Sequence, residues 1–134
     1  MYRIEELITI ASEKGASDVH LIAGLPPKCR IDGLITNLTE ETLTHEDCEE
    51  YGRQLAGEDV SEIFHRGQLD LSAAIAGHRI RINLFRQQGS LSAALRLLNS
   101  SIPQLDDLGL PPAVRQFSRW NKGIVLVTGE PGSG

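Results

Sequence analysis

The clearest structural pattern lies in residues 69–98, which read LDLSAAIAGHRIRINLFRQQGSLSAALRLL. Two-residue turns at Ala76-Gly77 and Gln88-Gly89 would fold this stretch into three antiparallel strands. Turns of this kind need positive φ angles at their central residues. In that register one face is apolar throughout. The three predicted cross-strand rows are Leu69–Leu84–Ala93, Leu71–Ile82–Leu95 and Ala73–Ile80–Leu97. A slip of one residue would send every one of these side chains to the other face, so the pattern specifies the register.

The residues before this meander predict helices that can cover its apolar face. Ile4, Leu7, Ile8 and Ala11 follow helical spacing within residues 3–14, and Gly15 stands where a left-handed cap would end that helix. A capping box at Thr44 and Asp47 predicts a second helix that ends near residue 56. A short helix over 59–66 should then end at Gly67.

Short extended segments lie between the first two helices. We expect strands over 18–22, 28–31 and 34–38, with Asp32-Gly33 as a hairpin turn between the last two. The sequence therefore predicts an α+β domain in which an antiparallel sheet carries helices on one face.

The opposite face of the meander places two like charges side by side. The register sets Arg81 directly across from Arg96, with Ser72 in the same row, and like-charged neighbours repel unless an anion lies close to them. Asp70, diagonal to Arg81, and solvent could supply a surface salt bridge. An anion bound from outside the sheet is the other interpretation, and the pattern leaves both open.

The chain changes character after Leu98. Residues 99–112 contain Pro103 and are typical of a linker, 113–120 predict a short helix, and 124–127 predict a parallel strand buried on both faces. The glycines of Gly129-Glu130-Pro131-Gly132-Ser133-Gly134 have the spacing of a G-x-x-x-x-G-K-[ST] phosphate-binding loop. Its Lys and Ser/Thr would follow Gly134, so we expect a fragment that cannot hydrolyse nucleotide by itself. A glycine-rich tail is the alternative.

Composition excludes several classes of protein. The formal charge of −5 and the pI near 5.3 argue against a generally basic nucleic-acid binder. No apolar run approaches the roughly 20 residues that cross a bilayer, and the first residues do not resemble a signal peptide. Cys29 and Cys48 have no metal-ligand spacing, so we expect no metal site and a reducing, cytoplasmic setting.

Several collinear motifs together resemble the type IV pilus retraction ATPases, the PilT or twitching-motility family of the secretion-ATPase superfamily. The proline-containing segment at 23–27 is typical of the retraction group. The motifs, as they stand here, are Ala16-Ser17-Asp18-Val19-His20-Leu21, Ala23-Gly24-Leu25-Pro26-Pro27, Arg30-Ile31-Asp32-Gly33, Arg79-Ile80-Arg81-Ile82-Asn83-Leu84-Phe85, Arg96, Ile102-Pro103, Leu105-Asp106-Asp107-Leu108-Gly109-Leu110-Pro111 and Gly123-Ile124-Val125-Leu126-Val127-Thr128-Gly129.

The resemblance implies a domain plan and a site. It implies a PAS-like domain over 1–98, a linker over 99–112, and over 113–134 the start of a truncated RecA-like ATPase domain. ATP with Mg²⁺ would sit between the two domains of the intact protein, with Arg81 and Arg96 as the catalytic arginines that reach its phosphates. The loop residues Gly129, Glu130, Pro131, Gly132, Ser133 and Gly134 would hold the nucleotide.

The resemblance also implies partners. The intact protein would be a cytoplasmic homo-hexamer that acts on the platform proteins of the pilus at the inner membrane, and it would bind no nucleic acid and reach the membrane only through those partners. Pilus assembly or type II secretion by a member of the same superfamily is one alternative. A stand-alone PAS-like sensor is another, because Ala73, Ala74, Ala93 and Ala94 leave room for a ligand cavity. A P-loop kinase or GTPase is disfavoured, since a long segment precedes the loop.

Overall fold

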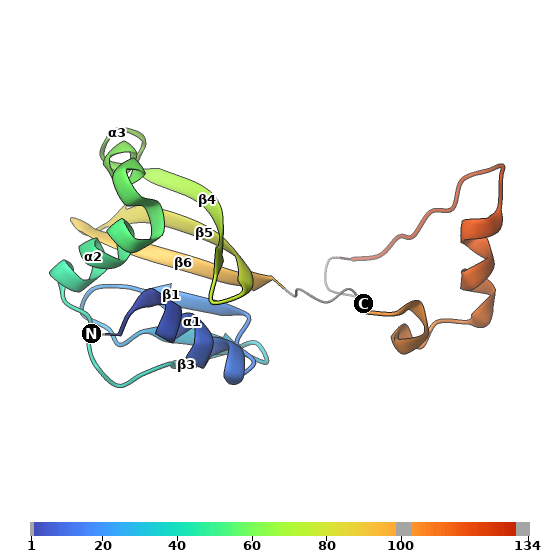
Figure 1. Ribbon diagram of the computed structural model, residues 1–134, viewed down its shortest axis with the longest axis horizontal. Coiled ribbons are helices and arrows are strands. Elements are labelled where there is room, and N and C mark those ends of the chain that lie inside the picture. Colours follow the sequence, from blue (N-terminus) through green and yellow to red (C-terminus); the bar gives the residue numbers. More distant parts are fainter. Residues whose placement is uncertain (1, 99–102, 131–134) are drawn as a thin grey trace. The chain divides into compact units, whose positions relative to one another are not determined.

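The computed structural model describes residues 2–98 and 103–130 (Figure 1). The chain divides into two compact units, Met1–Ser100 and Ser101–Gly134. The first unit carries the sheet, the long helices and the hydrophobic core.

The first unit is built on one six-stranded antiparallel sheet with strand order β3-β2-β1-β6-β5-β4. Strands β1 and β6 therefore lie side by side in the middle of the sheet, although they are far apart in the sequence. The strands are β1 (Asp18–Leu21), β2 (Lys28–Ile31), β3 (Leu34–Asn37), β4 (Gln68–Ile75), β5 (His78–Gln87) and β6 (Ser90–Leu98).

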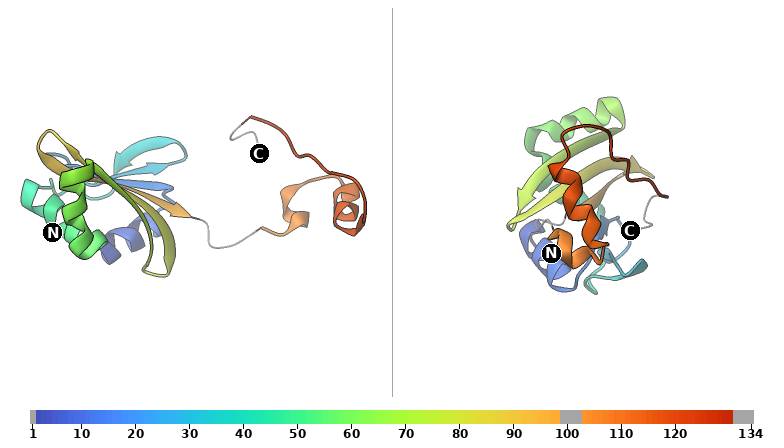
Figure 2. Two further views of the ribbon diagram at one scale, coloured as in Figure 1. Left: turned by 90° about the horizontal axis from the view of Figure 1, so that it is seen from above. Right: turned by 90° about the vertical axis from the view of Figure 1, so that its right-hand side faces the viewer.

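Three helices lie on one face of this sheet (Figures 1 and 2). They are α1 (Ile4–Glu13), α2 (His45–Ala56) and α3 (Glu62–Arg66), with a 3-10 turn, η1 (Gly57–Ser61), between α2 and α3. The predicted α+β domain with helices on one face of an antiparallel sheet is confirmed. The short helix predicted over 59–66 is instead divided between η1 and α3, and α3 ends at Gly67, whose backbone is left-handed.

The predicted register of the meander is confirmed in all three rows. Leu84 pairs with Leu69 and Ala93, Ile82 with Leu71 and Leu95, and Ile80 with Ala73 and Leu97. The turns adopt the expected positive φ angles at both central residues, 49° and 78° at Ala76-Gly77 and 51° and 81° at Gln88-Gly89. Asp32-Gly33 forms the third such turn, with φ angles of 49° and 81°.

The apolar face of the sheet and the helices share one core. The helical stripe of α1 is fully buried, and in α2 the residues Cys48, Tyr51, Gly52 and Leu55 face inward. They pack with Val19, Leu21, Ile80, Ile82, Leu84 and Leu95 of the sheet. Each fully buried Leu or Ile contributes on the order of 2 kcal/mol, so this contact layer accounts for much of the drive to fold.

The capping box at the start of α2 is confirmed. The backbone N–H of Asp47 donates to Thr44 Oγ1 at 3.1 Å, and the backbone N–H of Thr44 donates to Asp47 Oδ2 at 2.8 Å. The Thr44 hydroxyl also donates to Asp47 Oδ2, at 2.9 Å, and the two hydrogen bonds that Thr44 donates to this carboxyl lower its pKa. The box satisfies two helix-end donors and fixes where α2 begins.

The second unit contains two 3-10 helices, η2 (Leu105–Leu108) and η3 (Pro112–Arg119). The short helix expected over 113–120 is present as η3. The prediction of a buried strand over 124–127 is wrong, because these residues form no strand and the exposed fractions of Ile124 and Val127 are 86% and 94%. A parallel strand is held by the ladder of a neighbouring strand, and no described segment pairs with 124–127.

Gly52 offers a test of how closely α2 packs on β6. A Cβ atom at this position would lie 2.1 Å from Cδ2 of the buried Leu91. We therefore expect Gly52→Ala to lower the free energy of unfolding by about 1–3 kcal/mol, although Gly→Ala in a helix ordinarily stabilises. Urea denaturation of the single variants and of Gly52→Ala/Leu91→Ala measures this. The double variant should lose less than the sum of the two single losses. A Gly52→Ala protein that is more stable than the wild type would contradict the close packing.

Candidate functional site

Charged side chains line up across the face of the sheet opposite the helices. Cross-strand pairing joins Arg30 of β2 to Asp18 of β1, Asp18 to Arg96 of β6, Arg96 to Arg81 of β5, and Arg81 to Ser72 of β4. We call these five residues the polar row. Residues that are directly opposite in adjacent strands share a face, so the predicted juxtaposition of Arg81 and Arg96 is present.

Asp18 lies between two of the arginines and contacts both. Its Oδ1 accepts a hydrogen bond from Arg96 Nε at 3.0 Å, and its Oδ2 lies 3.7 Å from Arg30 Nε. Ser17 Oγ donates to the same Oδ2 at 2.7 Å. The Asp18 side chain is only 14% exposed, whereas that of Arg96 is 68% exposed. The carboxylate is therefore the fixed member of the pair, and the guanidinium extends from it toward solvent.

These contacts keep Asp18 ionised. Burial acts to raise the pKa of the Asp18 carboxyl, but the hydrogen bonds from Ser17 and Arg96 and the charges of Arg96 and Arg30 outweigh burial. The net effect lowers the pKa below its ordinary value. The polar row thus carries three positive charges and one negative charge, a net of +2.

Arg81 is the arginine of the polar row that has no counter-ion among the described residues. Within residues 2–98 and 103–130 no carboxylate lies within ion-pair distance of its guanidinium. The salt bridge to Asp70 that the sequence left open is not formed, because Asp70 Oδ1 instead accepts a hydrogen bond from Asn83 Nδ2 at 3.1 Å. An exposed arginine beside a second guanidinium is suited to an anion that contacts both.

A shallow pocket of about 190 Å³ lies over the polar row. Arginine, carboxylate, imidazole and amide groups meet there on an open surface. Its lining residues are Asp18, His20, Asp70, Arg81, Asn83, Ala94, Leu95 and Arg96. The pocket is open to solvent, and its lining pairs two arginines, Arg81 and Arg96, with two carboxylates, Asp18 and Asp70, so its formal charges balance. Arg81 is the arginine there that has no ion pair among the described residues, so an anion carried by a larger ligand could contact it.

The predicted phosphate-binding loop is not assembled in the described residues. Gly129 and Glu130 belong to an extended, exposed segment, and Pro131, Gly132, Ser133 and Gly134 lie outside the described residues. The roles of all six in holding a nucleotide stay predictions.

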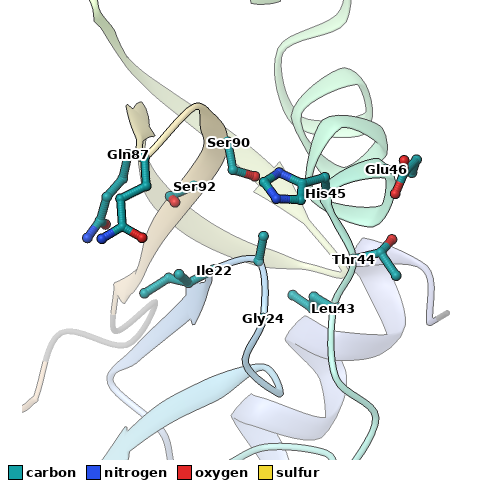
Figure 3. Close-up of a pocket in the computed structure, with 11 residues that line it drawn as sticks. Ile22, Gly24, Leu43, Thr44, His45, Glu46, Gln87, Ser90 and Ser92 are labelled. Atoms are coloured by element: carbon teal, nitrogen blue, oxygen red, sulfur yellow. The ribbon is translucent and has the colours of Figure 1, made fainter.

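A second pocket, of about 370 Å³, lies where α2 begins (Figure 3). Ser90 and Ser92 of β6 face it, and the His45 side chain is directed toward Ser90. Both serines are buried, at 5% and 2% exposure, and their hydroxyl oxygens have no hydrogen-bond partner in the described part of the chain. A buried hydroxyl that makes no hydrogen bond carries a desolvation cost.

The remaining candidate groups serve the fold. Cys29 and Cys48 are buried and unbonded to one another, and burial, together with the nearby Asp47 and Glu49 carboxylates, raises the pKa of Cys48 to about 11. Burial likewise raises the pKa of Tyr51 to about 12, and its hydroxyl donates to the Tyr2 carbonyl at 2.7 Å. No cluster of three metal-ligating side chains occurs among the described residues. None of the described helices has the length and apolar character needed to span a bilayer.

Sequence reasoning did not find Asp18 and Arg30 as members of the site. Both were identified only as parts of family motifs, because the pairing of β1 with β6 was not predicted. A signal was available, since Val19 and Leu21 alternate with polar residues and match Leu95 and Ala93 across the strands. Aligning those apolar positions would have set Asp18 beside Arg96.

Comparison with known proteins relates the chain to pilus ATPases. No family model matches it. It is 35% identical over 133 residues to the uncharacterized protein YggR of Escherichia coli K12, covering 98% of this chain and 40% of YggR. It is 32% identical over 133 residues to the type IV pilus retraction ATPase PilT of Pseudomonas aeruginosa, covering 98% of this chain and 39% of PilT. The chain thus spans about 40% of the length of these curated relatives.

Solved structures show the same relationship. A crystal structure of the pilus retraction motor PilT with bound ADP matches with a TM-score of 0.87 and 39% identity, over 100% of this chain and 40% of that one. The ATPase DotB of Legionella pneumophila shares the fold, with a TM-score of 0.72 at 18% identity over 84% of this chain and 33% of DotB. Over nearly its whole length the chain is therefore PilT-like, and its α+β domain has the fold of the matching part of the PilT structure.

The lowered pKa of Asp18 predicts a pH-dependent contribution to stability. A carboxyl group whose pKa is depressed by folding stabilises the protein above its unfolded-state pKa of about 3.9, and that contribution is lost as the pH falls through the folded-state value. We therefore expect Asp18→Asn to be less stable than the wild type at pH 7, with the gap closing below pH 4. Denaturant unfolding at pH 7, 5 and 3 measures this. A gap that stays constant or widens in acid would show that the carboxylate is not stabilised by its neighbours.

The unsatisfied hydroxyl of Ser92 predicts a stabilising substitution. Ser92→Ala removes a buried hydroxyl that has no partner, so the free energy of unfolding should rise by about 1 kcal/mol. Ser72→Ala on the exposed part of β4 is the matched control and should change stability by less than about 0.5 kcal/mol. Thermal and urea unfolding provide the comparison. If Ser92→Ala loses stability, the hydroxyl has a favourable interaction that the geometry does not record.

Proposed function

We propose that this segment is the nucleotide-facing N-terminal domain of an ATPase that drives type IV pilus retraction. One observation carries the proposal: Arg81 and Arg96 stand side by side on an open face of the sheet, and Arg81 has no counter-ion among the described residues. The similarity to PilT, a relative described as a retraction ATPase, and the ADP bound in the similar PilT crystal structure support ATP as the anion.

The chemistry of ATP hydrolysis suits two adjacent arginines. Negative charge on the phosphate oxygens must be stabilised in the transition state, and guanidinium groups supply multiple charge-assisted hydrogen bonds in a fixed plane. Arginines on neighbouring strands of a rigid sheet are also held at a set spacing, which reduces the reorganisation required when the charge develops.

The proposed domain plan is the one that the family resemblance implies. In this proposal, 1–98 is a PAS-like domain, 99–112 is the linker, and 113–134 begins a RecA-like ATPase domain whose phosphate-binding loop starts at Gly129. The order of the elements supports a PAS-like description. Three strands are followed by a helical segment and three more strands, and β1 and β6 are central in the sheet. The loop would hold the phosphates, and Mg²⁺ would neutralise part of their charge.

The motor would work as an assembly. We propose a cytoplasmic homo-hexamer at the inner face of the membrane, in which ATP binding closes the two domains of a subunit. Rigid-body movement about the linker near Pro103 would then be passed to the platform proteins of the pilus. Pilus assembly or secretion by the same class of motor would use the same arginines.

Removing either arginine tests the proposal. In the full-length protein that contains this segment, Arg81→Ala or Arg96→Ala should lower kcat for ATP hydrolysis by on the order of 10²-fold, because each would withdraw a charge from the developing phosphate oxygens. Both variants should fold normally, since both side chains are exposed. Arg53→Ala, an exposed arginine on the helical side, is the control and should keep wild-type activity.

Steady-state ATPase rates and circular dichroism spectra decide the outcome. Wild-type hydrolysis by both arginine variants would remove the phosphate role and favour a stand-alone PAS-like interaction domain instead.

A further inference from the structure

Asp18 places a negative charge on a face of the sheet that would bind an anion. A carboxylate beside a phosphate site repels the ligand, and its removal would raise the net charge of the polar row from +2 to +3. Its presence in the middle of the row therefore calls for a compensating benefit.

The geometry of the contact points to that benefit. Asp18 Oδ1 engages Arg96 through Nε, on the inner edge of the guanidinium, at 3.0 Å. In the described part of the chain no hydrogen bond involves the two terminal nitrogens of Arg96. The carboxylate thus anchors the inner edge of the guanidinium, while its two outer amino groups stay available to a ligand.

Asp18 is itself held firmly. Ser17 Oγ donates to its Oδ2, and the backbone of Ser17 is bonded on both sides, by its N–H to the Arg30 carbonyl at 2.9 Å and by its carbonyl to the Leu97 N–H at 3.0 Å. Arg30 lies 3.7 Å from Oδ2 and offsets the negative charge. The carboxylate is therefore held in one position between β2 and β6.

The Arg96 side chain is long and 68% exposed, and an arginine side chain loses rotamer entropy when it is immobilised. If that ordering is completed before the ligand arrives, it does not have to occur in the transition state.

We infer that Asp18 is a positioning residue, which holds Arg96 through Nε so that its terminal amino groups meet a triphosphate beside Arg81. This inference rests on the proposed function, because it assigns Asp18 a role in the same site. It makes a prediction that a purely structural role does not make: loss of the carboxylate improves electrostatic attraction for the polyphosphate and impairs catalysis.

The first experiment uses the 134-residue chain and tripolyphosphate as the probe. NMR signals of the arginine Nε–Hε groups report on order at Arg96. In the wild type the Arg96 Nε–Hε signal should be resolved and protected from exchange, and in Asp18→Asn it should broaden or exchange faster. Tripolyphosphate should bind Asp18→Asn at least as tightly as the wild type and should bind Arg96→Ala more weakly.

The second experiment measures ATP hydrolysis by the full-length protein that contains this segment. Asp18→Asn should lower kcat about 10-fold without raising KM, because misplaced guanidinium groups cost catalysis more than binding. Asp18→Glu keeps the charge but shifts the carboxylate by one methylene, so it should recover only part of kcat. Asp32→Asn, the same charge change in the exposed β2–β3 turn, should match the wild type.

The outcomes separate the two claims. If Arg96→Ala loses activity while Asp18→Asn keeps wild-type kcat and KM, the proposed function stands and the positioning role is overturned. A higher KM and weaker tripolyphosphate binding in Asp18→Asn would also overturn it. If neither Arg81→Ala nor Arg96→Ala affects hydrolysis, the proposed function itself fails, whatever Asp18→Asn does.

Discussion

The pairing of β1 with β6 is the constraint on which the rest of the domain depends. It joins the N-terminal strands to the C-terminal meander, and it sets Asp18 beside Arg96 across 78 positions of sequence. The same pairing places Val19 against Leu95 on the other face, where the helices cover them. One ladder of backbone hydrogen bonds thus builds the core on one face and the polar row on the other.

The two faces of the sheet have opposite physical requirements. The inner face is apolar and is covered by α1, α2 and α3, so its stability comes from burial of Leu, Ile and Val side chains. On the outer face, the polar row holds three arginines and one ordered carboxylate at the cost of local repulsion between Arg81 and Arg96. This repulsion is weak because both guanidinium groups are exposed to solvent. A polyanion that contacts both groups would be attracted by each of them.

Much of the first unit could be predicted from local patterns, because hairpins, helical stripes and caps depend on residues close in sequence. The meander register, the three turns and the Thr44–Asp47 cap were all recoverable in this way. The Asp18–Arg96 contact was not, since it depends on long-range pairing that a reading of single segments does not test. The prediction of a strand over 124–127 was wrong for a related reason: a buried parallel strand depends on the strands beside it, and apolar composition alone does not supply them.

The central claim is that an ordered carboxylate and two adjacent guanidinium groups form one half of a triphosphate site. A crystal structure of the full-length protein with a non-hydrolysable ATP analogue tests it most directly. The account predicts terminal nitrogens of Arg81 and Arg96 within about 3 Å of phosphate oxygens, with Arg96 Nε still bonded to Asp18. An analogue bound to the phosphate loop with both arginines directed away from it, or with Arg96 released from Asp18, would contradict the account.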